Sequence, residues 1–230
     1  MASVAVAAPF RWYRTSLGKK GVMAVTGIIM VLFVIGHIFG NLKIFEGASV
    51  LDTYASFLRT VGAPVFLNSQ LLWLVRLVLL ASVILHVVAA VQLTQQNRAA
   101  RPVRYARKSD LNATVASRTM RWGGAFVGLF IVYHILNLTT GTIHPGYVEG
   151  QVYQNVVRDF QTWWIALIYI AAMLALGLHL YHGTWSVFQT FGLRSQGNTR
   201  AIRIGAGILT ALFLVASISL PLAVLVGFVK

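Results

Sequence analysis

The 230-residue sequence contains no cysteine and only five acidic residues. Without cysteine there can be no disulfide, thiolate-ligated haem, cysteine-held iron–sulfur cluster or thiol nucleophile. Any cofactor is therefore expected to be held by nitrogen or oxygen ligands. Charged residues make up 10% of the chain against 57% hydrophobic residues, and the mean hydropathy is +0.74. This composition lies far outside that of soluble domains and indicates a helical membrane protein.

Five apolar runs are long enough to cross a bilayer as helices. They cover residues 21–39, 71–93, 122–140, 163–188 and 204–228. The runs leave only short connections, so we predict one all-α, polytopic membrane domain over residues 1–230, arranged as a four-helix-plus-one bundle. The first run is full length and precedes another span, so it is expected to be a retained helix and not a signal peptide.

The same five runs contain no Asp or Glu. A chain of carboxylates that carries protons or cations through the membrane is therefore disfavoured, and with it an ion-coupled transporter. Polar groups are energetically costly in hydrocarbon, so any polar residue within the apolar runs is a candidate for a functional role.

Basic residues are distributed unevenly between the two ends of the predicted bundle. One end carries 14 of the 19 Lys and Arg residues, namely Arg11, Arg14, Lys19, Lys20, Arg98, Arg101, Arg104, Arg107, Lys108, Arg118, Arg121, Arg194, Arg200 and Arg203. Four of the five acids lie at the other end, and only Asp110 shares the basic one. The positive-inside rule then predicts a cytoplasmic N-terminus and an outside C-terminus. The membrane is expected to be a bacterial cytoplasmic (inner) membrane. Because basic loops are expected on the cytoplasmic side, a nucleic-acid partner is disfavoured.

Four of the six histidines, His37, His86, His134 and His179, each lie in a different apolar run. At about 1.5 Å per residue, His37 and His134 lie about 24 and 18 Å from the inner ends of their runs. His86 and His179 lie about 22–24 Å from the outer ends, in a hydrocarbon core of about 30 Å. Depth therefore predicts an outer pair, His37 with His134, and an inner pair, His86 with His179, about 10–18 Å apart.

Two imidazoles at each level suit haem b, because the porphyrin supplies four further nitrogens and the protein need supply only two axial ligands. Zinc would need additional ligands that the apolar runs do not offer. A single membrane histidine can instead be a hydrogen-bonded core residue or a member of a proton relay. Four histidines at two matched depths favour two stacked bis-histidine haem b centres with His37, His86, His134 and His179 as the iron ligands.

Other side chains are candidates for contacts with a haem propionate or a quinone. His182 follows His179 by three residues on nearly the same helix face, one turn closer to the inner surface, and could also be a plain interfacial residue. The inner quinone candidates are Ser16, Lys20, His182 and Trp185, and the outer ones are Tyr54, His144 and Trp163. His144 is otherwise expected to be an ordinary surface residue. We also predict a short surface helix over residues 51–58, and turns at Pro145, Gly146 and Gly150 within the outer connection over residues 141–162.

Several segments are similar to one known family. Residues 15–20 (TSLGKK), 23–27 (MAVTG) and 36–42 (GHIFGNL) resemble the cytochrome b558-type membrane subunit of succinate dehydrogenase/fumarate reductase. Residues 179–186 (HLYHGTWS) match the fourth-helix ligand motif of that family, H-x-x-x-G-x-W-S, with His182 where its members often carry Asn. The resemblance extends from about residue 10 to 225 and agrees in the number of helices and the placement of the histidines.

The resemblance implies a membrane anchor for a flavoprotein subunit and an iron–sulfur subunit. Electrons from succinate would pass through the inner haem and then the outer haem to a quinone, expected to be menaquinone. The iron–sulfur partner is expected to present acidic residues to the N-terminal arm and to residues 98–121. The sequence leaves open whether succinate is oxidised or fumarate reduced. Three alternatives also remain open: a haem b subunit of a hydrogenase or formate dehydrogenase, a transmembrane ferric reductase, and a transporter or channel.

Overall fold

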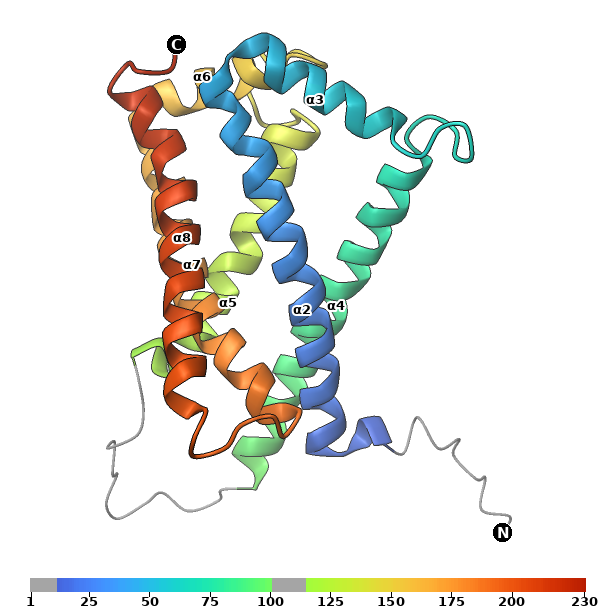
Figure 1. Cartoon of the computed structure of the whole chain (residues 1–230), viewed down its shortest axis with the longest axis vertical. Helices are drawn as coiled ribbons and strands as arrows, with labels where there is room; N and C mark the ends of the chain where they lie inside the picture. Colours follow the sequence, from blue (N-terminus) through green and yellow to red (C-terminus); the bar gives the residue numbers. More distant parts are fainter. Residues whose placement is uncertain (1–11, 101–114) are drawn as a thin grey trace.

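A computed structural model describes residues 12–100 and 115–230, and these parts of the chain are helical with no strand (Figure 1). Five helices are long and apolar enough to cross a membrane. They are α2 (Ser16–Asn41), α4 (Gln70–Ala99), α5 (Val115–His134), α7 (Trp163–Thr190) and α8 (Thr199–Leu225). The predicted all-α, multi-pass fold with five membrane-spanning helices is confirmed.

The helices are longer than the apolar runs from which they were predicted. Helix α2 begins at Ser16 because Thr15 caps it, its hydroxyl accepting a hydrogen bond from the amide of Gly18 at 2.9 Å. Helix α4 continues past the apolar run through polar residues to Ala99. Hydrogen bonding within a helix does not stop where the hydrocarbon does, so hydropathy locates a span better than its ends.

The bundle has two distinct ends, which we name by what they contain. The α3/α6 end holds α3 (Ala48–Thr60), α6 (Val152–Gln161) and the C-terminus, whereas the arginine-rich end holds the start of α2, the end of α4 and the α7–α8 connection (Figure 1). Helix α2 packs mainly on α4, α5 packs on α7, and α8 packs on the other side of α7. Four helices therefore form the bundle and α8 is the additional one.

The α3/α6 end is the better packed part of the molecule. Its buried core joins η1 (Leu42–Glu46), α3, α6 and the neighbouring ends of α7 and α8 through residues such as Ile44, Leu51 and Val157. Asp52 of α3 accepts a hydrogen bond from the amide of Tyr153 at 2.9 Å and so caps the first turn of α6. The short helix predicted at residues 51–58 is confirmed as part of α3.

The turns predicted at Pro145, Gly146 and Gly150 are confirmed, whereas α6, which follows them in the same connection, was not predicted. Its cap, the Asp52 carboxylate, lies about a hundred residues away in sequence, and the local pattern of Pro and Gly gave no indication of it. Along the rest of the bundle, large apolar side chains face outward, for example Leu32 at 65%, Leu129 at 73% and Val215 at 73% exposure. Such a continuous apolar exterior fits contact with lipid.

Candidate functional site: two histidine pairs

The four membrane histidines meet in two pairs. The ring centroids of His37 (α2) and His134 (α5) lie 5.8 Å apart, and those of His86 (α4) and His179 (α7) lie 6.1 Å apart. All four side chains are half-buried. We call His37 and His134 the distal pair, because it lies at the α3/α6 end, and His86 and His179 the proximal pair. These are the pairs that depth along the membrane normal predicted from the sequence.

The spacing within each pair suits two axial ligands of one metal. With metal–nitrogen bonds of about 2 Å and about 1 Å from each nitrogen to its ring centre, two imidazoles on one iron have centroids roughly 6 Å apart. In addition, among the described residues α4 does not pack directly on α7, nor α2 on α5. Helices in direct contact lie about 8–10 Å apart, so helices that meet only through facing imidazoles leave more space between them.

The two pairs lie at different heights in the bundle. An added Cβ at Gly27 of α2 would lie 3.6 Å from the ring of His86, and one at Gly124 of α5 would lie 3.5 Å from the ring of His179. Gly27 precedes His37 by ten residues, and Gly124 precedes His134 by ten. Ten residues at 1.5 Å per residue separate the pairs by about 15 Å along the bundle axis.

The two histidines of the proximal pair differ in their hydrogen bonding. The hydroxyl of Thr26 donates to the carbonyl of Val22 at 2.7 Å and lies 3.0 Å from Nδ1 of His86. Because the hydroxyl proton is already used, Nδ1 of His86 is the donor, which leaves the lone pair on Nε2. In His179, by contrast, the buried Nδ1 has no hydrogen-bond partner among the described residues. Residue 123, which corresponds in α5 to Thr26 in α2, is a glycine.

Aromatic side chains orient the distal pair. Phe33 stacks on His37 with a centroid distance of 5.2 Å, and Phe130 stacks on His134 at 5.8 Å, in each case from four residues earlier in the same helix. The hydroxyl of Tyr169 (α7) lies 3.2 Å from Nδ1 of His134. Each ring is therefore fixed on one face by a phenylalanine from its own helix, and a hydroxyl meets the outer nitrogen of His134.

Beyond Tyr169 a buried polar cluster continues towards the α3/α6 end. Asn137 lies in η2 (Ile135–Thr139), a π-helical turn that directly follows His134. Its amide donates a hydrogen bond to Asp159 and faces the Tyr169 oxygen. Asp159 Oδ1 lies 3.2 Å from Nδ1 of His144, at ion-pair distance. Asn137, Asp159 and His144 are only 2%, 3% and 5% exposed. Single π-turns inside α-helices occur frequently at functional sites.

The expectation that His144 is an ordinary surface residue is wrong. The connection that carries it folds back under α6, and the Asp159 carboxylate next to its ring compensates for the burial of a polar side chain. Two indirect signals of this cluster are present in the sequence, an acid four residues before an apolar span and an Asn three residues after a membrane histidine. It did not show that the two residues meet.

The inner quinone candidates differ in their surroundings. Ser16 and Lys20 are exposed in the first turns of α2. Trp185 of α7 is instead covered by two guanidinium groups, those of Arg194 at 4.9 Å and Arg203 at 4.8 Å from its ring. Within the described residues, no hydrogen bond or ring contact joins Ser16 or Lys20 to Trp185 or to the half-buried His182.

The outer quinone candidates also differ in their surroundings. The ring of Tyr54 in α3 lies against Gly40, the residue before the last of α2, and beneath the ammonium group of Lys43 at 5.6 Å. Trp163, at the start of α7, is 65% exposed, whereas His144 is buried. Residues 101–114, which include much of the predicted docking surface, lie outside the described residues.

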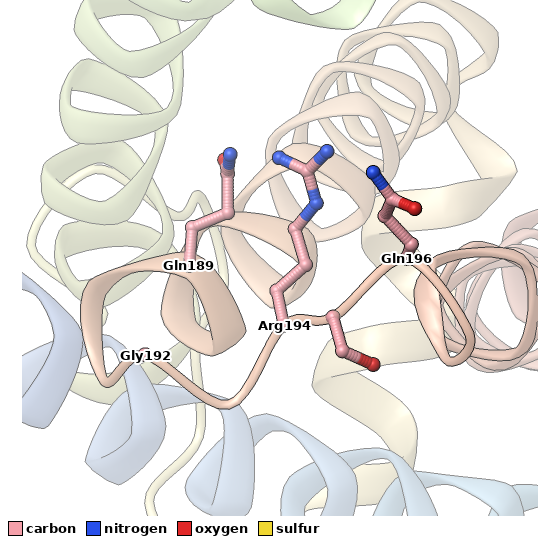
Figure 2. Close-up of a pocket in the computed structure, with 5 residues that line it drawn as sticks. Gln189, Gly192, Arg194 and Gln196 are labelled. Atoms are coloured by element: carbon pink, nitrogen blue, oxygen red, sulfur yellow. The ribbon is translucent and has the colours of Figure 1, made fainter.

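A shallow pocket lies at the arginine-rich end, away from both histidine pairs. It is formed by the α7–α8 connection, and its lining residues are Gln189, Gly192, Arg194, Ser195 and Gln196. Figure 2 shows the side chains of Gln189, Arg194 and Gln196 projecting in the same direction from this connection. The pocket has polar walls and no histidine, so it is not a candidate for either metal centre.

The residues of the two pairs fit two haem groups by the chemistry of their donors. Each pair offers two neutral nitrogen donors and no carboxylate, and no group of three or more metal-ligating side chains occurs within residues 12–100 and 115–230. A metal that brings its own equatorial ligands suits such a set better than a bare cation. Comparison of the chain with family models, curated proteins and solved structures gave no match.

Proposed function

We propose that this protein is the di-haem b membrane anchor of a succinate:quinone oxidoreductase. His37 and His134 would be the axial ligands of the distal haem, and His86 and His179 those of the proximal haem. The observation that carries the proposal is the meeting of four membrane histidines in two pairs whose ring centroids lie 5.8 and 6.1 Å apart. The resemblance to the cytochrome b558-type family supports the assignment of the partner enzyme.

When bound, haem b supplies one-electron redox chemistry, and the protein contributes the geometry that makes it useful. The histidine pairs fix two centres about 15 Å apart along the bundle axis. Gly27 and Gly124 leave room beside the proximal imidazoles. Thr26 holds the His86 ring in the tautomer that presents Nε2. The chain would therefore hold two redox centres at fixed positions between the ends of the bundle.

The arginine-rich end is proposed as the docking side for the iron–sulfur subunit. Seven basic side chains described there are exposed: Arg14, Lys20, Arg98, Arg121, Arg194, Arg200 and Arg203. The acids whose placement is described, Glu46, Asp52, Glu149 and Asp159, all belong to the α3/α6 end. A uniformly positive end favours an acidic partner surface and steers its approach. By the positive-inside rule this end faces the cytoplasm.

Purification of the tagged chain from its native bacterial membranes tests the function. We expect a flavoprotein and an iron–sulfur subunit to copurify, and succinate to reduce part of the haem absorbance. Copurification of a hydrogenase or formate dehydrogenase would assign the chain to that class instead. Haem-containing protein that no dehydrogenase accompanies would favour a ferric reductase, and protein without haem absorbance would favour a transporter or channel.

Charge reversal tests the docking side separately. Replacement of Arg104, Arg107 and Lys108 by Glu is expected to release the soluble subunits from the purified complex while both haems remain. A matched control reverses Arg59 and Arg76, which belong to α3 and α4 and lie towards the opposite end. Full retention of the soluble subunits after the first reversal would contradict docking through this loop and leave its charges as a feature of topology and lipid contact.

A further inference from the structure

The distal pair is connected to a buried carboxylate through two side chains that no metal ligand requires. From His134 the connection runs to the hydroxyl of Tyr169, from there to the side chain of Asn137, and from Asn137 to Asp159. The members come from three elements: α7, the π-turn η2 and α6. Tertiary structure brings the three residues together, because they lie on different elements and at least ten residues apart in the sequence.

Donor and acceptor chemistry gives this connection a direction. An ionised carboxylate only accepts hydrogen bonds, so Asn137 turns its amide NH₂ towards Asp159. The same Asn137 amide faces the Tyr169 oxygen as a donor. That oxygen lies 3.2 Å from Nδ1 of His134. When it accepts a hydrogen bond from Nδ1–H, the lone pair of His134 is left on Nε2.

Burial of the Asp159 carboxylate, at the end of this connection, is energetically unfavourable. Burial raises the pKa of Asp159, while the neighbouring His144 and the hydrogen bond from Asn137 act in the opposite direction. The side chain is 3% exposed, and a buried carboxylate must be compensated by partners. Its Oδ2 accepts a hydrogen bond from Asn137, and its Oδ1 lies 3.2 Å from Nδ1 of His144.

We infer that Tyr169 is a positioning residue for His134, whose Nδ1–H it accepts so that Nε2 faces the distal metal centre, and that Asn137, held by Asp159, keeps Tyr169 in place. The inference rests on the proposed function, because it presupposes a metal at the distal pair. Outer partners of this type orient a ligating histidine and raise its basicity. A more basic ligand stabilises ferric over ferrous iron, so the connection lowers the midpoint potential of the distal haem relative to an unconnected one.

Substitution of Tyr169 by Phe tests this on the purified complex, with the midpoint potential of each haem as the readout. The variant keeps the ring that packs against Phe130 and Phe160 and removes only the hydroxyl. We expect the preference of the distal site for ferric iron to fall about tenfold, which raises its potential by about 59 mV for a one-electron couple. The proximal haem should not change.

Tyr133→Phe is the matched control. Tyr133 also packs on Phe130 and on Tyr169, but it makes no hydrogen bond to His134. Both haem potentials should stay unchanged in this variant. Equal shifts in Tyr169→Phe and Tyr133→Phe would overturn the inference in favour of a packing effect, as would a Tyr169→Phe complex whose distal potential matches that of the wild type.

Asp159→Asn tests the far end of the connection. It keeps the size of the side chain and removes the charge that holds the Asn137 amide, so Tyr169 should be held less firmly and the distal potential should again rise while the proximal one stays constant. If this variant does not assemble, Tyr169→Phe decides the matter alone. Wild-type protein that binds no haem would refute the proposed function itself, whereas two bound haems with potentials insensitive to both substitutions would refute only this inference.

Discussion

Thr26 Oγ1 lies 3.0 Å from Nδ1 of His86 and accepts its hydrogen bond, because its own proton is donated to the carbonyl of Val22. Removal of the acceptor in Thr26→Val should make His86 a less basic ligand and raise the midpoint potential of the proximal haem by about 59 mV, the equivalent of a tenfold change. Thr26→Ser keeps the hydroxyl and should behave as wild type. Redox titration of both variants checks this, and equal potentials in the two would contradict it.

Substitution of Gly123 tests the opposite change, the addition of a hydroxyl group beside His179, the other ligand of the proximal centre. Nδ1 of His179 has no described partner, and a Cβ added at residue 123 meets no heavy atom within 4 Å. Gly123→Thr should supply in α5 the hydroxyl that Thr26 supplies in α2, and so lower the proximal potential. Gly123→Ala adds the carbon without the hydroxyl and is the control. A fall in potential of equal size in both variants would show that the hydroxyl is not responsible.

Single alanine substitutions should sort the four histidines by centre. His37→Ala and His134→Ala are each expected to remove the distal haem and keep the proximal one, because those two rings face each other. His86→Ala and His179→Ala should remove the proximal haem in the same way. Low-temperature absorption spectra of the four variants distinguish the two centres. Loss of the same haem from His37→Ala and His86→Ala would show the pairing to be wrong.

The raised pKa of Asp159 predicts the pH dependence of stability at the α3/α6 end. A carboxyl with a higher pKa in the folded than in the unfolded state binds more protons when folded. Its contribution to stability is therefore complete below the unfolded value and is lost as the pH rises through the folded value. Relative to Asp159→Asn, the wild type should lose thermal stability from about pH 4 upward. Thermal unfolding in detergent checks this, and a difference that does not vary with pH would contradict it.

The sequence predicted the fold class and the histidine partners because both depend on distance along a single helix. An apolar run of sufficient length predicts a span, and a rise of about 1.5 Å per residue converts the position of His37 or His86 into a depth. Two histidines at one depth in a small helix bundle are therefore expected to face each other. The structure accordingly brings His37 to His134 and His86 to His179.

The partners around the histidines could not be predicted in this way. Whether Tyr169 meets His134 depends on the rotation of α5 and α7 about their axes, and whether Asn137 meets Asp159 depends on a π-turn that hydropathy does not detect. Helix α6 is capped by Asp52 from another connection, so its local sequence reads as a loop. His144 was misjudged for the same reason, since its burial depends on the position of α6.

The central claim is that each chain holds two bis-histidine haem b groups, and the haem content of the purified protein tests it most directly. A pyridine haemochrome assay against protein concentration should give two haem b per chain, both low-spin in the absorption spectrum, as expected for two axial imidazoles. The His37→Ala and His86→Ala variants should each give one, and the double variant none. One haem or none in the wild-type chain would contradict the account.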